Sequence, residues 1–214
     1  MSPTSTAHIS VLRLALALAA PAAVFAAIPG CSDPVPAIPR VIIESTIGPG
    51  GNPAATCGIS SSDWITIGNF GGPGTPPRPV DDKAAEGSGA VSASCSVIPE
   101  GDGFRVSAQA SISGLNAGSI IVAGLFRPSP DPLKAPLQEN ITVVFSRRDF
   151  GRWEQKDCKA TYSVSPTAGV AAGRIWAKTT CPTAKNLDNG ARLCEATVQF
   201  RFENCEQAVT GQVQ

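Results

Sequence analysis

Apolar and polar residues alternate along most of the chain after residue 90, which is the pattern of strands with one buried face. The clearest early pair covers residues 91–97 and 104–112, on either side of a glycine-containing turn, and predicts a hairpin. Further short strands are expected at residues 41–43, 64–67, 141–145 and 158–164. Residues 120–126 are apolar on both faces, so we expect a central strand there that is covered on both sides.

The strongest alternation is near the C-terminus, in residues 174–181 and 194–203. Folding these runs antiparallel about the loop at 186–190 places Cys181 opposite Cys194 and predicts a disulfide between them. The short closed segment would stabilise the fold by roughly 3 kcal/mol. A bond between Cys158 and Cys181, across a hairpin near residue 169, is the competing prediction.

Cys205 lies at the far end of its strand from Cys194, so its partner is expected to be Cys57 or Cys95. The sequence leaves the full pairing of six cysteines open.

These runs amount to eight or nine short strands, with no amphipathic helical pattern and no internal repeat. The sequence therefore predicts an all-β, disulfide-stabilised antiparallel sandwich of two sheets, with immunoglobulin-like and jelly-roll topologies both open. Residues 68–89 form a long stretch rich in Gly and Pro without periodicity, which predicts a mobile or functional loop.

The N-terminal region has a different pattern. Residues 14–28 are apolar apart from one proline, which is too short a stretch to span a bilayer comfortably but suits the core of a signal peptide. Cleavage before Ala27, after small residues, and cleavage before Cys31 are the two alternatives.

Ile28, three residues before Cys31, and Gly30, directly before it, resemble the lipobox of bacterial lipoproteins. That resemblance implies that Cys31 is the first mature residue and carries a lipid, and that Ser32 directs the protein to the outer membrane. Seven cysteines become an even set of six when Cys31 is set apart, as expected in an oxidising compartment. Cleavage before Ala27 would instead leave Cys31 as a free thiol in a soluble secreted or periplasmic protein.

The expected organisation is a signal peptide over residues 1–30, a Pro-rich tether over 31–40, one β-sandwich domain over 41–207 and a flexible tail over 208–214. The mature domain resembles uncharacterised lipoproteins of Gram-negative bacteria, with a cysteine closing its last strand at residues 200–205. That resemblance implies no activity.

Composition excludes several kinds of chemistry. The formal net charge is zero, so no nucleic-acid partner is expected. His8 is the only histidine and leaves with the signal peptide, which excludes Ser-His and Cys-His pairs and His-containing metal sites from the mature domain. No Cys-x-x-Cys motif occurs, so structural disulfides are favoured over a metal site and no cofactor is predicted. A calcium site in an acidic loop stays open, although no spacing matches an EF-hand.

Strand parity places Arg174, Trp176 and Lys178 on the outer face of the C-terminal hairpin, next to Gln199 and Arg201. An aromatic ring beside cations and an amide predicts a ligand surface for sugars or acidic groups. The simpler interpretation is that Trp176 covers the sheet, packs on arginine stems or lies under a loop.

The leading functional hypothesis is a non-enzymatic envelope lipoprotein that is anchored in the membrane through Cys31 and binds a glycan or protein partner. The alternatives are a polysaccharide hydrolase with paired carboxylates, for which the sequence selects no pair, and a purely structural or adhesive domain.

Overall fold

The computed structural model describes residues 37–207 except 52, 61 and 116. The chain divides into Met1–Val35 and Pro36–Gln214, and all the described residues belong to the second unit. The expected signal peptide, Cys31, most of the tether and the expected tail at 208–214 lie outside the described residues.

The described part consists almost entirely of strands. The elements in chain order are β1 (Arg40–Gly48), the four-residue helix α1 (Ala54–Cys57), β2 (Ser62–Ile67), β3 (Val80–Asp81), β4 (Ala85–Glu86), β5 (Gly89–Glu100), β6 (Gly103–Ile112), β7 (Gly118–Phe126), the 3₁₀ turn η1 (Pro132–Lys134), β8 (Gln138–Arg147), β9 (Gly151–Thr161), β10 (Gly169–Ala171), β11 (Arg174–Asn186) and β12 (Leu193–Glu203). Among these residues no helix has the length and hydrophobicity needed to cross a membrane.

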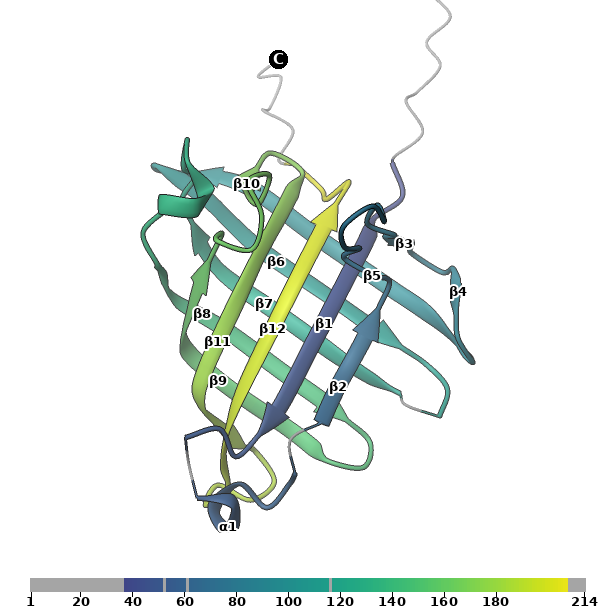
Figure 1. Ribbon diagram of the computed structural model, residues 1–214, viewed down its shortest axis with the longest axis vertical. Helices are drawn as coiled ribbons and strands as arrows, with labels where there is room; N and C mark the ends of the chain where they lie inside the picture. Colours follow the sequence, from purple (N-terminus) through teal and green to yellow (C-terminus); the bar gives the residue numbers. More distant parts are fainter. Residues whose placement is uncertain (1–36, 52, 61, 116, 208–214) are drawn as a thin grey trace, which may run out of the picture. The chain divides into compact units, whose positions relative to one another are not determined.

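All twelve strands belong to one sheet, with the order β2-β1-β12-β11-β9-β8-β7-β6-β5-β4. Two short strands pair beside this path, β3 on β1 and β10 on β11. Neighbouring strands are antiparallel throughout, and β5 to β9 follow one another directly as a meander (Figure 1). The all-β, antiparallel part of the prediction is confirmed, but the strands form one continuous sheet rather than two separate ones.

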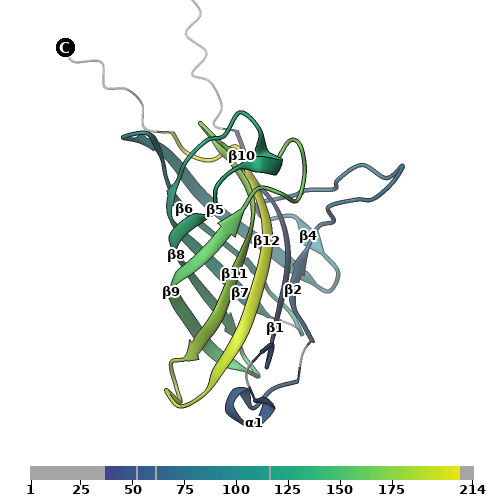
Figure 2. The same cartoon turned by 60° about the vertical axis from the view of Figure 1, so that its left-hand side comes forward.

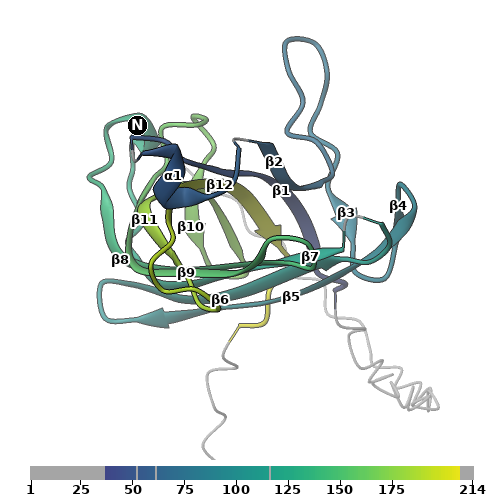
Figure 3. The same cartoon turned by 90° about the horizontal axis from the view of Figure 1, so that it is seen from below.

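The sheet curls over on itself and nearly closes, so that β1, β11 and β12 lie across from β5, β6 and β7 (Figures 1 and 3). Two connections join the half of the sheet that contains β1 and β12 to the half that contains β5. The segment with β3 and β4 pairs with β1 on one side and with β5 on the other. After β12, Glu206 pairs with Ser96 of β5, and the disulfide Cys95–Cys205 lies beside this pair.

The predicted alternation is confirmed by burial. In β5 the odd-numbered residues 91–97 are buried, and in β12 the even-numbered residues 194–202 are buried. The core between the two halves of the sheet holds large side chains, among them Trp64, Trp153, Tyr162 and Phe200. The Tyr162 hydroxyl donates to the Arg127 carbonyl at 3.0 Å, and burial raises the pKa of this phenol well above its ordinary value of 10.0.

The β11–β12 register differs from the prediction by two residues. Cys181 lies opposite Ala196, and a bulge between Cys181 and Ala184 places Ala184 opposite Cys194. The hairpin tip is also later than expected, because Asn186 N donates to the carbonyl of Arg192 at 3.1 Å. A shift of two residues keeps every side chain on its predicted face, so alternation alone does not reveal it.

The predicted Cys181–Cys194 disulfide is therefore wrong, because the later hairpin tip places Ala196 opposite Cys181 and Ala184 opposite Cys194. The disulfides are Cys158–Cys181, which was the competing prediction, Cys57–Cys194 and Cys95–Cys205. Cys205 thus bonds to one of its two expected partners. All six cysteines of the described part are paired.

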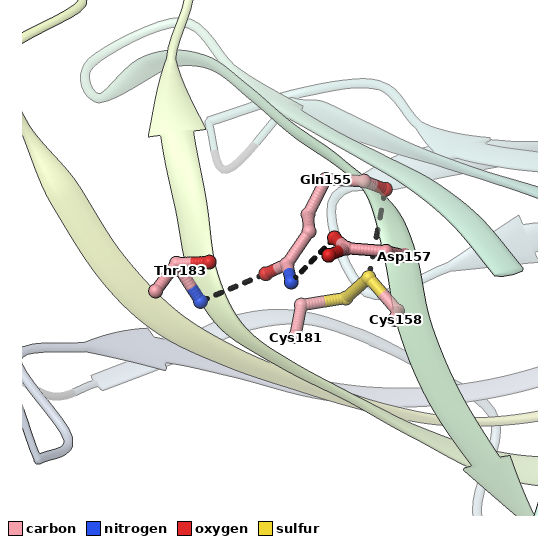
Figure 4. The surroundings of a disulfide bond; sticks show 5 residues. All are labelled: Gln155, Asp157, Cys158, Cys181 and Thr183. Carbon is pink, nitrogen blue, oxygen red and sulfur yellow. Dashed lines mark hydrogen bonds between the residues drawn. A yellow bond between two sulfur atoms is a disulfide. The ribbon is translucent and has the colours of Figure 1, made fainter. Parts of the chain in front are cut away.

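The bulge in β11 also interrupts its pairing with β9. Registered pairs run from Lys178 to Thr180 and resume only at Lys185. Gln155 of β9 fills part of the interval: its Oε1 accepts from Thr183 N at 2.8 Å and its Nε2 donates to Asp157 at 2.9 Å (Figure 4). This buried amide and the adjacent Cys158–Cys181 disulfide join the two strands where the regular ladder is absent.

Two other expectations need correction. In β7 the outward residues Ile121, Ala123 and Leu125 are only partly buried, so this strand is fully covered on one face rather than on both. Residues 68–89 contain β3 and β4, and only 68–79 form an extended loop, which projects from the sheet between β2 and β3 (Figure 2).

Candidate functional site

The outer face of β2, β1, β12 and β11 carries a row of polar side chains. Thr66 pairs with Glu44, Glu44 with Gln199, and Gln199 with Lys178, so one row crosses four neighbouring strands. Along each strand these four residues alternate with buried residues, so their side chains point away from the core. The row combines a hydroxyl, a carboxylate, an amide and an ammonium group on a rigid sheet.

This face is hollowed next to the row. The hollow has a volume of about 350 Å³ and is lined by Glu44, Ser45, Thr46, Thr66, Lys178, Thr197 and Gln199. Thr46 and Thr197 lie opposite each other, and their hydroxyls are hydrogen-bonded at 2.9 Å. We refer to these seven residues as the polar hollow. Its lining is almost wholly made of groups that both donate and accept hydrogen bonds or carry charge.

An aromatic cluster lies on the same outer face, in the row that contains Trp176 and Arg201. Phe70, at the base of the 68–79 loop, is stacked on Trp176 with ring centroids 5.8 Å apart. The Arg201 guanidinium lies over the Trp176 ring at 5.1 Å and is also paired with Glu203. Trp176 is thus partly covered by a loop and an arginine, as the simpler sequence interpretation expected.

The base of the loop is held in place by Glu86. Arg78 donates to both carboxylate oxygens of Glu86, at 2.6 and 2.9 Å, and Gly68 N donates to the same carboxylate at 3.2 Å. The hydrogen bond from Arg78 is the main cause that lowers the pKa of Glu86 from its ordinary value of 4.5. These contacts fix the chain on either side of Phe70 and therefore support the aromatic stack.

A second hollow, of about 260 Å³, lies farther along β11 from the polar hollow, next to Trp176. It is lined by Thr167, Gly169, Arg174, Ile175, Trp176, Arg201, Phe202 and Glu203. The indole Nε1 of Trp176 is buried and has no hydrogen-bond partner among the described residues. A buried donor without a partner costs on the order of 1–3 kcal/mol.

The structure places the three predicted surface residues on the outer face but divides them between the two hollows. Arg174 and Trp176 line the second hollow, whereas Lys178 lines the polar hollow. Arg201 contacts Trp176 directly, as strand parity suggested, and Gln199 lies beside Lys178.

Sequence reasoning missed the contribution of β1 and β2 to this surface. Glu44 and Thr46 alternate with the buried Ser45 and Ile47, a signal that extends the predicted strand beyond residue 43. Their position beside β12 has no local signal, because the paired residues are more than 150 positions apart.

The paired-carboxylate hypothesis finds no support in these hollows. Among the residues that the structure describes, Glu44 is the only carboxylate that lines the polar hollow, and Glu203 is the only one that lines the second hollow. Within residues 37–207, apart from the three gaps, no three His, Cys, Asp or Glu side chains are grouped as a metal site would require.

No protein-family model, no curated protein and no solved structure matches this chain.

Proposed function

We propose that this protein is a non-enzymatic binding domain of the bacterial cell envelope that recognises a saccharide on the outer face of β2, β1, β12 and β11. The observation that carries the proposal is the polar hollow next to an aromatic cluster. Sugar hydroxyls donate and accept hydrogen bonds, which fits a lining of threonines, an amide, a carboxylate and an ammonium group. Phe70 and Trp176 are both partly exposed, so their stacked rings offer an apolar surface for a sugar ring.

The envelope location is part of the same proposal, with Cys31 as the lipid attachment point in the outer membrane. Its support is that the other six cysteines are joined in three disulfides, which is typical of an oxidising compartment. Cys31 is then the only cysteine left for another role. Mass spectrometry of the native protein tests this part: an acylated Cys31 supports it, and an unmodified N-terminus at Ala27 contradicts it.

A glycan array tests the binding part of the proposal. The wild-type protein is expected to bind at least one saccharide, and Gln199→Ala in the polar hollow is expected to weaken that binding. Trp176→Ala should also weaken it, by about three- to tenfold, because the aromatic surface is lost. Lys159→Ala, an exposed lysine on β9 whose only ion partner among the described residues is Glu139, is the matched control and should bind as the wild type does.

Two outcomes would contradict the saccharide site. The first is an array on which the wild-type protein binds nothing, which would favour a structural or adhesive domain. The second is binding that survives both Gln199→Ala and Trp176→Ala, which would place the ligand elsewhere.

A further inference from the structure

A groove that is separate from both hollows crosses the outer face of β5, β6, β7 and β8. These four strands do not contribute to the polar hollow. It has a volume of about 620 Å³ and is lined by thirteen of the described residues. Three of these thirteen are cationic, Lys83, Arg147 and Arg148, and none carries a carboxylate. In a chain with a formal net charge of zero, this groove is a local concentration of positive charge.

Two cations of the groove are available to a ligand. Lys83 and Arg148 are exposed, and neither has an ion partner among the described residues. Arg147 has a structural role instead, because its Nε lies 3.0 Å from Asp149 and its Nη1 donates to the Trp64 carbonyl at 3.2 Å. Lys83 has a φ of +66° and donates its backbone N–H to the Val91 carbonyl at 2.9 Å, which fixes its position beside β5.

Hydroxyl groups connect the two ends of the groove. Ser92 pairs with Ser111, Ser111 with Ser119, and Ser119 with Ser146, so four serines of four neighbouring strands form one outward row. Neighbouring strands are about 4.8 Å apart, so the row spans about 14 Å. None of the four hydroxyls has a hydrogen-bond partner among the described residues.

The same row continues into β9, where Arg152 pairs with Ser146. Arg152 is exposed, faces outward and has no ion partner in the described part of the chain. Unpaired cations thus lie at both ends of a row of free hydroxyl donors. The four serines and Arg152 belong to strands and Lys83 is fixed against β5, so the sheet sets their spacing, whereas Arg148 lies in the turn directly after β8.

We propose that this groove binds an acidic oligosaccharide, a short chain of sugars that carry carboxylate groups. Lys83 at one end and Arg148 and Arg152 at the other pair with the carboxylates, and the serine hydroxyls bond to the sugar oxygens between them. No aromatic side chain of the described part of the chain lines the groove, so it lacks the stacking surface that single-stranded nucleic acids use. The site is separate from the polar hollow, and either can fail without the other.

Isothermal titration of the protein with hexagalacturonate, compared with the neutral maltohexaose, tests the assignment. Hexagalacturonate is expected to bind at low salt, to bind more weakly as salt is added, and to shift the amide NMR signals of Ser111 and Ser119. Maltohexaose should not shift these two signals. Arg148→Gln and Arg152→Gln should each weaken hexagalacturonate binding about two- to fivefold, and the triple variant with Lys83→Asn by about tenfold or more. Asparagine is chosen at position 83 because it tolerates a positive φ.

Lys134→Gln is the matched control, since it removes one exposed cation from the β7–β8 loop at the other end of these strands. The affinity of Lys134→Gln for hexagalacturonate should equal that of the wild-type protein. Three results would overturn the proposal: equal binding of hexagalacturonate and maltohexaose, a loss for Lys134→Gln as large as for Arg148→Gln, or no change in the triple variant. Binding to vesicles that contain phosphatidylglycerol without binding to hexagalacturonate would also overturn it, in favour of a membrane surface.

Discussion

The Cys95–Cys205 disulfide joins the segment that follows β12 to β5. Its removal should weaken the contact that holds these two parts of the sheet together. The bond lies beside two backbone hydrogen bonds, from Glu206 N to the Cys95 carbonyl at 2.8 Å and from Val97 N to the Glu206 carbonyl at 2.9 Å. Both cysteines are buried, so replacement of both by alanine removes the covalent link together with two buried sulfur atoms.

The loss of folding stability can be calculated from the number of residues in the loop that the bond closes. Its cysteines are 110 residues apart, which corresponds to about 5 kcal/mol of chain entropy in the unfolded state. The intact Cys57–Cys194 bond shortens the closed path to about 49 residues, so we expect about 4 kcal/mol. For a domain of this size such a loss lowers Tm by about 8–16 °C.

Thermal and urea unfolding of Cys95→Ala/Cys205→Ala measure this loss. Removal of Cys158 and Cys181 is the matched comparison, because that bond closes only 23 residues and should cost about 3 kcal/mol. The amide of Val97 should also exchange faster in the first variant and not in the second. A smaller loss for the Cys95–Cys205 pair than for the Cys158–Cys181 pair would refute the reasoning from chain closure.

Three further outcomes follow from single contacts. Gln155→Leu should lower the free energy of unfolding by about 1–3 kcal/mol in urea titrations, because the backbone N–H of Thr183 loses its acceptor where the β9–β11 ladder is absent. Tyr162→Phe should cost about 1 kcal/mol by the same assay, since it removes one hydrogen bond to a backbone carbonyl. Finally, the pKa of Glu86 is lowered in the folded protein, so its ion pair stabilises the loop base above the ordinary pKa of 4.5, and this stabilisation is lost as the pH falls through the lowered value. The exchange protection of the Gly68 amide should decrease in that acidic range, and Glu86→Gln should abolish the pH dependence.

The alternation of apolar and polar residues predicted the strands and their buried faces because it depends only on neighbours in sequence. Residues 91–97 and 104–112 form the expected hairpin, and the buried positions of β12 are those that the sequence indicated. The outward positions of Trp176 and Lys178 followed from the same parity.

What alternation did not predict is the order of the strands and the pairing of the cysteines. The neighbours of β12 are β1 and β11, and β1 ends 145 residues before β12 begins, so no local pattern indicates that contact. The bulge after Cys181 moves the buried positions of β11 from odd-numbered residues to Ala184 and Asn186, and it lies beyond the run 174–181 from which the strand was predicted. The polar hollow depends on the β1–β12 contact, which is why the four of its seven lining residues that β1 and β2 contribute were missed.

The pairing of the first strand with the last has a consequence for how the chain reaches its fold. As the chain emerges during synthesis, Cys57 and Cys95 appear first among the six paired cysteines, yet they bond to Cys194 and Cys205, which appear last. Oxidation in order of appearance would join these two to each other and trap a wrong disulfide. Native bonds therefore form late or by exchange, and maturation should depend on a catalyst of disulfide isomerisation. Such distant contacts also predict slow folding, on the scale of milliseconds to seconds once the bonds are correct.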